Sequence, residues 1–377
     1  MRKKHMSALS GLTAAAATLA AVVGTTAAAA ALTVVVATTA FAATKAAKPT
    51  PGTPLEPPAI TAPIVGTVTP ATTGWVPAQV VDVNSFPLDS HPRYHAKSKT
   101  FFVGPNGEGF LVHVIFPPTW NTKMPPAGTW PHYHYYHEWG YTLKGDFVLG
   151  EPVTPEQKNG MVSHKHEGGW LSRPAYSLHG GSPEEGGIRA QFPYDLLIFE
   201  EGDGSLVQTG PGGDHIKPDF PGEKPNPYLP DWKKVKNFTR PWLVDTQNNM
   251  EWETDQHVAG RFVKWLSDDM ADGFRAQLVK IPPGWKPADN KRTYNANANV
   301  LRYMISGDMN VWVFKGPKDA GQPYIVRENG FVYQPPRSIW GYGDGEVTKE
   351  GAVWLEVTYA KGLSVGHGPI ESPQPAE

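Results

Sequence analysis

The chain of 377 residues contains no cysteine, which excludes disulfide bonds, thiolate metal ligands and a lipid-anchored N-terminal cysteine. Any metal site must therefore use histidine, carboxylate or tyrosine ligands. The chain also lacks an excess of either charge, because 34 Lys and Arg residues nearly balance 36 Asp and Glu residues. No broad basic surface is predicted that could bind nucleic acid or an anionic membrane.

Long amphipathic helical patterns are few, whereas glycine, proline and tryptophan are frequent. The chain has 39 Gly, 38 Pro and 13 Trp residues, a composition typical of many short strands joined by turns. With 377 residues and 40% hydrophobic content, it is long enough for two domains, each with its own core. The sequence therefore predicts an all-β protein of two domains.

The first 42 residues have the pattern of an export signal. A basic start, Met1-Arg2-Lys3-Lys4-His5, precedes an uncharged stretch rich in Ala, Val, Leu and Thr that runs to Thr44. Ala40-Phe41-Ala42 has the small-x-small form that signal peptidase accepts, so we expect cleavage after Ala42. The alternative is a retained N-terminal anchor, although Ala and Thr are weak membrane formers. We expect a periplasmic or secreted protein, without membrane attachment after cleavage, that takes up metal outside the cytoplasm.

Two Pro-rich stretches divide the rest of the chain. Residues 43–73 are dominated by Pro, Thr, Ala and Gly and are predicted to form a semi-extended tether. A Pro/Gly-rich linker is predicted at 210–236. These stretches delimit an N-terminal domain, 74–209, and a C-terminal domain, 237–368, which we expect to be followed by a disordered tail at 369–377.

The two predicted domains resemble copies of each other. Three pairs of short β-like segments recur in the same order, and the offset between the copies falls steadily along the chain, as small loop deletions in a duplicated domain would produce. The first pair ends in Pro-Pro-x-Trp, and the second runs into a Gly-Asp turn. The pairs are Phe110–Trp120 with Arg275–Trp285, Tyr141–Asp146 with Tyr303–Asp308, and Leu197–Glu200 with Val357–Ala360.

The N-terminal copy contains a candidate metal site. Side chains alternate between the faces of a strand, so His132 and His134 project together, Glu138 has the same parity, and Tyr133 points to the other face. Neutral imidazoles with one carboxylate suit a divalent transition metal and leave a net charge of about +1 that would attract an anionic substrate. His179, in the later segment Gly168–Gly180, supplies a fourth ligand.

These two segments resemble the signature motifs of the cupin superfamily. The first motif has His-x-His, a Glu and a Gly at fixed spacing, and the second has Gly, Pro and His. The chain departs from the usual pattern at Tyr176, Pro126 and Pro183, none of which is a ligand position. The matching residues are His132, His134, Glu138 and Gly145 in the first motif, and Gly168, Pro174 and His179 in the second.

The resemblance implies two tandem cupin jelly-roll (double-stranded β-helix) barrels, with one divalent metal ion inside the first. In the second half the ligand positions carry Tyr294, Ala296, Val300 and Trp340, which cannot replace the metal-binding set. We therefore expect a metal-free second barrel, with Trp340 in the vacated pocket, that packs face to face against the first barrel.

The resemblance identifies ligands but not a reaction. Fe²⁺ is favoured, with Cu, Mn, Zn and Ni as alternatives. Three His and one Glu leave coordination positions open, which favours catalysis. The first hypothesis is a dioxygenase that cleaves a small aromatic or dicarbonyl substrate. The alternatives are a non-oxidative Mn, Ni or Zn lyase, isomerase or decarboxylase, and a non-enzymatic ligand-binding or metal-binding cupin. A small-molecule substrate and a homo-oligomer are the expected partners.

Three residues are candidates for catalysis beside the metal. His166 lies just before the second motif and could move a proton. Tyr133 and Tyr176 lie within the two motifs, where they could act on a proton or stack against a flat substrate. His113 and His164 have no assigned role.

Overall fold

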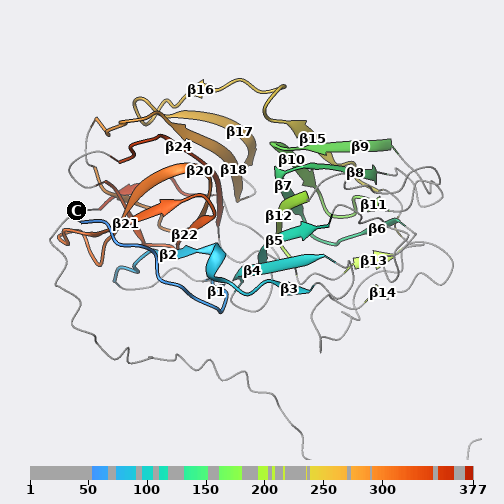
Figure 1. Ribbon diagram of the computed structural model, residues 1–377, viewed down its shortest axis with the longest axis horizontal. Coiled ribbons are helices and arrows are strands. Elements are labelled where there is room, and N and C mark those ends of the chain that lie inside the picture. The colour runs from blue at the N-terminus through green and yellow to red at the C-terminus, as the bar shows by residue number, and fades with distance from the viewer. Residues whose placement is uncertain are drawn as a thin grey trace, which may run out of the picture. The chain divides into compact units, whose positions relative to one another are not determined.

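The computed structural model describes residues 53–66, 74–90, 96–104, 110–117, 131–151, 161–180, 194–202, 206–208, 215–216, 235, 238–269, 273–288, 291–342, 347–360 and 370–376 (Figure 1). They belong to one compact unit, Thr50–Glu377. Apart from a short 3₁₀ turn, η1 (Val83–Ser85), the regular structure of these residues is β-strand, and they contain no helix long and apolar enough to cross a membrane. The prediction of an all-β protein is confirmed, while the predicted signal peptide, 1–42, lies outside the described residues.

The first barrel consists of a large sheet, a smaller sheet and a hairpin. In spatial order the large sheet contains β1 (Ile64–Val65), β4 (Lys97–Val103), β5 (Phe110–Phe116), β12 (Tyr194–Glu200), β7 (Glu138–Lys144), β10 (Gly169–Arg173) and β15 (Trp242–Asp245), with β3 (Asp89–Ser90) beside β4. The smaller sheet contains β11 (His179–Gly180), β6 (Pro131–Tyr133), β13 (Leu206–Gln208) and β14 (His215–Ile216), and the hairpin pairs β8 (Asp146–Glu151) with β9 (Met161–His166).

The second barrel repeats this plan. Its large sheet contains β16 (Glu253–Thr254), β17 (Phe262–Asp269), β18 (Phe274–Ile281), β24 (Ala352–Ala360), β20 (Ala298–Val313), β22 (Gly330–Gln334) and β2 (Gln79–Asp82), with β21 (Gln322–Arg327) beside β20. Its smaller sheet contains β23 (Ile339–Trp340), β19 (Thr293–Tyr294) and β25 (Gln374–Pro375). The order β18-β24-β20-β22 matches β5-β12-β7-β10, so the duplication predicted from sequence is also a duplication of topology.

Residues with a left-handed backbone also recur at matching places in the two copies. Gly168 and Asn329 have φ angles of 80° and 64° in the turn that precedes β10 and β22. Tyr176 and Arg337 have φ angles of 67° and 64° in the turn that precedes β11 and β23. Few non-glycine residues adopt this conformation, so its recurrence shows that both turns kept their geometry although their side chains differ. Tyr176 therefore adopts the left-handed conformation that a glycine at this position would adopt readily.

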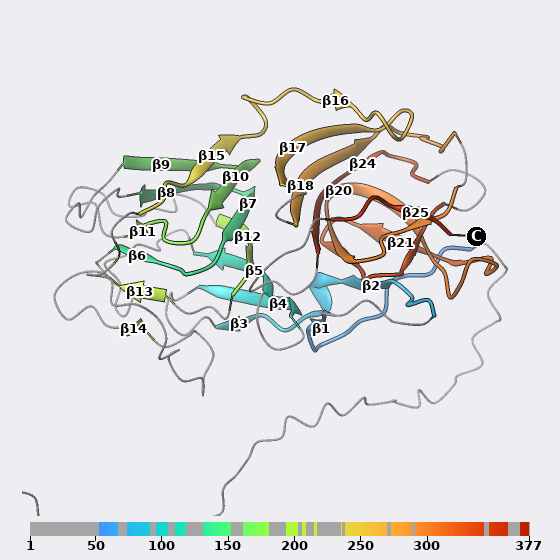
Figure 2. The ribbon, with the colours of Figure 1, turned by 180° about the vertical axis from the view of Figure 1, so that it is seen from behind.

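The two large sheets exchange edge strands. Strand β2 follows the predicted tether, yet it pairs with β22 of the second barrel, with Val80 opposite Val332. Strand β15 follows the predicted linker, yet it lies beside β10 of the first barrel (Figure 2). The two strands pair with Leu243 opposite Leu171. Domain boundaries at 74 and 237 thus place β2 in the first barrel and β15 in the second. In the structure, each of these strands pairs with the large sheet of the other barrel. Hydrogen bonding to an open sheet edge decides this placement.

Two segments predicted to be extended or disordered are paired with the barrels, and both predictions need correction. Within the predicted tether, Leu55 exchanges backbone hydrogen bonds with Pro323 and Ile325 beside β21, and β1 pairs in parallel with β4. Within the predicted disordered tail, β25 pairs with β19. Pro-rich composition signals extended backbone, but it does not reveal whether a sheet edge is available to pair with it.

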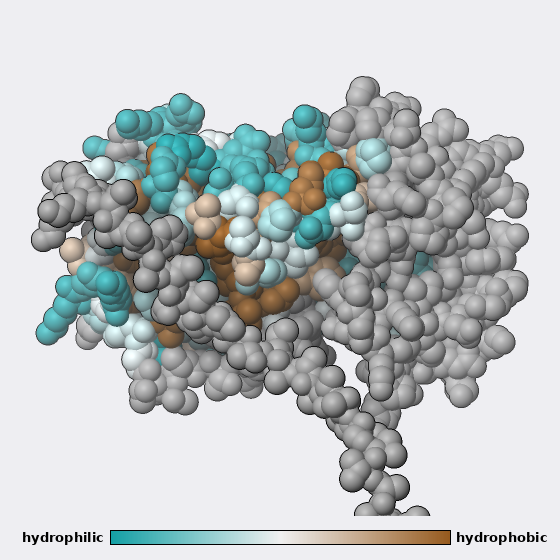
Figure 3. All heavy atoms as spheres, turned by 60° about the horizontal axis from the view of Figure 1, so that its bottom comes forward, coloured by the Kyte–Doolittle hydropathy of each residue, from teal (hydrophilic) through white to brown (hydrophobic). Residues whose placement is uncertain are grey.

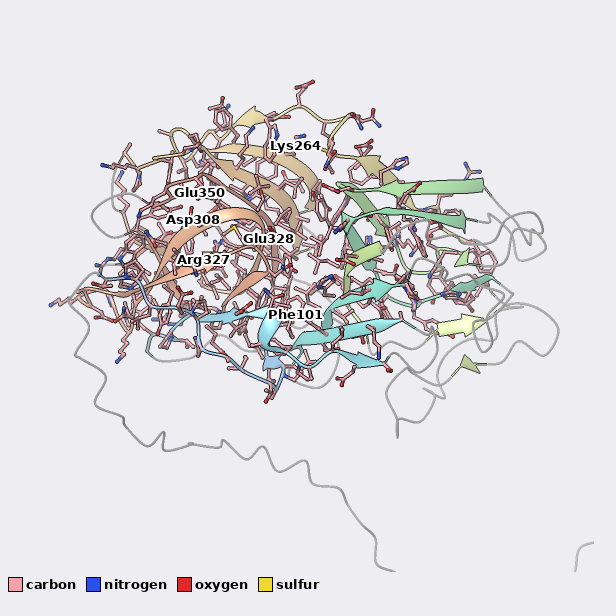
Figure 4. The ribbon with its side chains drawn as sticks, in the orientation of Figure 1. Phe101, Lys264, Asp308, Arg327, Glu328 and Glu350 are labelled. Atoms are coloured by element: carbon pink, nitrogen blue, oxygen red, sulfur yellow. The ribbon has the colours of Figure 1, made fainter. Side chains whose placement is uncertain are left out.

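Aromatic side chains fill the contact between the two large sheets. The rings of Trp139 and Phe274 stack with centroids 3.6 Å apart, and Phe101 meets Phe331 edge to face at 4.9 Å. All four side chains are buried, and Figure 4 shows Phe101 where the two sheets meet. Such aromatic pairs stabilise an interface beyond the area that they bury. The expected packing of one barrel on the other is therefore present. Trp139, which takes part in it, directly follows the predicted ligand Glu138 in the sequence.

Some large apolar side chains also reach the surface. Val65, Leu88 and Trp242 are each about half exposed. Figure 3 shows hydrophobic residues between hydrophilic ones on the face that it presents. Scattered apolar residues of this kind are ordinary for a protein surface. The expected homo-oligomer stays a prediction.

Candidate metal centre

The four predicted ligands come together at one end of the first barrel. His132 on β6 lies directly opposite His179 on β11, His134 follows β6, and Glu138 begins β7. One ligand atom from each of the three histidines lies within 4.8 Å of the other two. The Oε2 atom of Glu138 lies 3.2 Å from Nε2 of His134 and 3.8 Å from Nε2 of His179. The structure thus places in one cluster the residues that the two motifs predict as ligands.

Hydrogen bonds determine which nitrogen of His179 carries the proton. Its Nδ1 atom lies 3.0 Å from the carbonyl oxygen of Ser177. A carbonyl accepts but cannot donate, so Nδ1 bears the hydrogen and Nε2 is unprotonated in the neutral ring. Burial, followed by the nearby charge of Arg173, holds the pKa of His179 well below its ordinary value. His179 is therefore neutral at physiological pH, as a metal ligand must be.

A tyrosine and a carboxylate orient His134 in the same way. The hydroxyl of Tyr136 donates to Oε2 of Glu200 over 2.6 Å and lies 3.0 Å from Nδ1 of His134. Because its only hydrogen goes to Glu200, the hydroxyl accepts from Nδ1–H of His134. In the neutral ring Nε2 is then unprotonated, and it faces Oε2 of Glu138 at 3.2 Å. This carboxylate–phenol–imidazole chain plays the part of the outer-shell partners that orient metal-binding histidines.

This donor set fits a divalent cation. Nε2 of His134 and Nε2 of His179 lie 3.2 Å and 3.8 Å from one carboxylate oxygen of Glu138. When both rings are neutral, these atoms direct lone pairs at one another, and a bound cation would relieve their repulsion. Imidazole nitrogens with carboxylate oxygen suit Fe, Mn, Co, Ni, Cu or Zn in the divalent state. His132, His134, Glu138 and His179 would hold the ion.

Sequence reasoning did not identify Glu200 as part of the site. Glu200 ends β12 directly opposite Glu138 on β7, is buried, and forms a second potential metal-binding group with His134 and Glu138. Two buried carboxylates side by side repel each other unless a positive charge lies near. The sequence repeat aligns Glu200 with Ala360, but the strand register shows that its counterpart is Thr358, which lies opposite Val300 as Glu200 lies opposite Glu138. In either alignment the copy without the ligand set has no carboxylate at this place. This difference can be interpreted only when it is known that β12 and β7, which are not consecutive in the sequence, are neighbours in the sheet.

The three catalytic candidates lie elsewhere, which corrects the sequence interpretation. Tyr133 is fully buried on the opposite face of its strand, where it packs with Leu178 and against Phe238. Tyr176 packs on Tyr133, with ring centroids 5.7 Å apart. His166 is 55% exposed on the hairpin and lies 3.4 Å from Asp146. Tyr133 points away from the ligands because side chains alternate between the faces of a strand. His166 lies away from them because β9 is in an outward position.

The remaining histidines make other contacts. His137 lies 2.8 Å from the hydroxyl of Ser172 and stacks on Trp139. His113 is buried 3.7 Å from the carboxylate of Asp195. The side chain of His164 lies outside the described residues. The contact of His113 joins β5 to β12, whereas His137 joins the connection before β7 to β10.

A buried guanidinium lies beside the residue that replaces His179 in the second barrel. Arg302 stacks over Trp340, with its central carbon 3.9 Å from the ring centroid. It also donates to Glu356 over 2.5 Å and to Gln334. Among the described residues, the potential metal-binding groups all lie in the first barrel. Arg302 thus packs on the residue that stands at the position of His179.

No family model and no curated protein sequence matches the chain. A protein from Nostoc punctiforme with a provisional dioxygenase name is 15% identical with a TM-score of 0.49, over 79% of this chain and 87% of its own. Lactobacillus farciminis oxalate decarboxylase, in a formate complex, is 14% identical with a TM-score of 0.48, over 78% and 88%. Procruciferin, the 11S globulin of Brassica napus, is 12% identical with a TM-score of 0.46, over 74% and 83%.

The topology and the motifs of this chain agree with each other. Each half has the same order of antiparallel strands, and the residues of both motifs meet at one end of the first half. Two antiparallel barrels in tandem, with the paired cupin motifs assembled in the first, give this chain the fold of a bicupin.

Proposed function

We propose that this protein is a metal-dependent dioxygenase that acts on a small organic anion in its first barrel. The observation that carries the proposal is the donor set, in which nitrogens of three histidines and one oxygen of Glu138 converge. A structural site would surround its ion with protein ligands, whereas three His and one Glu leave positions for a substrate. When bound, a metal such as Fe²⁺ supplies a Lewis acid and a redox centre.

The charges around the site favour an anionic substrate. Lys165, Glu151, Arg173 and Glu138 are all buried and their formal charges sum to zero. Glu200 adds one negative charge, so a divalent ion would leave the site with about one positive charge. An enolate, phenolate or carboxylate oxygen would neutralise it. The residues of the chain thus select the charge of the substrate before any reaction.

A second candidate, a non-oxidative lyase, isomerase or decarboxylase, is favoured by the pair of Tyr136 and Glu200. The 2.6 Å hydrogen bond holds a phenolic proton against a buried carboxylate next to a ligand histidine. Such a pair can hold the proton that these reactions move between substrate atoms. In this case the metal would be Mn, Ni or Zn. A ligand-binding protein without turnover remains the third candidate.

Elemental analysis and oxygen uptake separate these candidates. The purified protein should hold about one Fe or Cu ion per chain and consume oxygen when supplied with a phenolic or 1,3-dicarbonyl anion. His179→Ala should hold much less metal, and Tyr135→Phe, whose ring packs with Tyr133 and Tyr176, should behave as wild type. One Mn, Ni or Zn ion with substrate loss but without oxygen uptake would move the function to the non-oxidative class. No stoichiometric metal would refute the proposal.

We also propose that the protein acts outside the cytoplasm. The basic start, the uncharged stretch and Ala40-Phe41-Ala42 support export. Mass spectrometry of the protein recovered from the periplasm or medium tests this, and the expected N-terminus is Ala43. A protein that stays in the cell with Met1 intact would contradict it.

A further inference from the structure

Glu138 occupies the middle of a row of charged residues that crosses the large sheet of the first barrel. Its neighbour on β10 is Arg173, and its neighbour on β12 is Glu200. Directly opposite residues on adjacent strands project from the same face, so these side chains meet inside the barrel. All three are at most 8% exposed. The row therefore joins the proposed metal ligand to a buried guanidinium.

The two oxygens of Glu138 have different partners. Oε1 accepts a hydrogen bond from Nη1 of Arg173, and Oε2 faces the Nε2 atoms of His134 and His179. The ion pair with Arg173 compensates the burial of the Glu138 carboxylate. Glu138 thus presents one oxygen to the histidine cluster while the other is bound.

A second carboxylate, that of Glu151, holds Arg173 in place. Its Nη2 atom donates to Oε1 of Glu151 over 2.8 Å, and Nζ of Lys165 lies 3.3 Å from the same oxygen. Burial opposes the charge of Arg173, but Glu151 and Glu138 outweigh burial and raise its pKa. A guanidinium has a rigid planar fork that can bind two carboxylates at once, which the single ammonium of lysine cannot do in the same geometry.

We propose that Arg173 is a positioning residue, which keeps Glu138 a one-oxygen ligand by holding its other oxygen away from the histidines. This inference rests on the proposed metal-dependent function. Turning Glu138 so that both oxygens reach a cation would break its hydrogen bond to Arg173. The coordination position that Glu138 would otherwise fill is then left for the substrate. Glu151 fixes Arg173 against the β8–β9 hairpin.

The second barrel provides a matched control. Arg302 is buried to a similar degree and binds Glu356 and Gln334, but the side chain beside it is Trp340 rather than a histidine. Arg302→Lys should therefore destabilise the protein much as Arg173→Lys does, without affecting the metal. Comparing the two variants separates a loss of fold from a loss of metal geometry.

The test is titration of the metal-stripped full chain with Co²⁺, in competition with a chromophoric chelator. Arg173→Lys, which keeps the charge, and Arg173→Met, which removes it, should both bind Co²⁺ roughly tenfold to a hundredfold more weakly than wild type. The visible Co²⁺ absorption should shift in both, because Glu138 reorients. Glu151→Gln should change both readouts in the same direction, and Arg302→Lys should change neither.

Other outcomes would overturn the inference. If Arg173→Lys binds as wild type and Arg173→Met binds more tightly, Arg173 acts only as a repelling charge and does not position Glu138. If all variants keep the wild-type affinity and absorption, Arg173 is structural. Wild type that binds no stoichiometric Co²⁺ would instead refute the proposed function itself. Thermal unfolding of each metal-free variant verifies that it is folded, and Glu151→Gln supplies the test if Arg173 variants are not.

Discussion

Replacing Tyr136 with Phe tests whether the phenol orients His134. The change removes one oxygen and keeps the ring, whose centroid lies 5.1 Å from that of His134. Nδ1 of His134 loses the acceptor 3.0 Å away, so the tautomer with the proton on Nε2 becomes accessible, and that proton would point towards the cation. Loss of such an outer-shell partner weakens metal binding about tenfold to a hundredfold, or about 1.4 to 2.8 kcal/mol.

The assay for this prediction is competition for Co²⁺ or Zn²⁺ with a chelator at fixed pH. Tyr135→Phe is the control, because it removes the same atom from the adjacent residue, whose ring meets Tyr133 and Tyr176 instead. Adding Glu200→Gln to Tyr136→Phe should cost little more than either change alone, since both act through one hydrogen-bonded chain. Equal affinity of the Tyr136 and Tyr135 variants would refute the reasoning.

Three further predictions concern the two barrels. His179→Ala should lower metal content well below one ion per chain while the unfolding temperature of the metal-free protein stays close to wild type; unchanged metal content would exclude His179 as a ligand. Trp340→His should still yield one ion per chain, because Tyr294, Ala296 and Val300 supply no matching ligands; two ions would contradict a metal-free second barrel. Burial raises the pKa of Glu356, but its arginine neighbours outweigh burial and lower it from 4.5 to about 2. Since the folded value lies below the unfolded one, this group stabilises the protein above pH 4.5 and loses up to about 3 kcal/mol as pH falls towards 2. Glu356→Gln should flatten that acid dependence in denaturant titrations, and an identical dependence would exclude Glu356 as its source.

Local spacing was sufficient to identify the ligand cluster. His132 and His134 share a face because strand residues alternate, and the second motif ends on His179, which pairs with His132 across β6 and β11. The duplication was also readable, because each copy repeats the same strands and turns. The same alternation argument places Tyr133 on the far face, so its proposal as a catalytic residue was inconsistent with the strand that carries it.

The sequence by itself determined the all-β class, the tandem repeat and the four residues of the metal motifs, since each depends on residues that are close together or on a pattern repeated in order. Only the tertiary structure decided that Arg173 and Glu200 flank Glu138, because β10, β7 and β12 are neighbours in the sheet but not along the chain. It also decided that β2 and β15 join the opposite barrels and that the tail pairs with β19. An open sheet edge accepts any strand that reaches it, and which strand reaches it depends on the folded path of the whole chain.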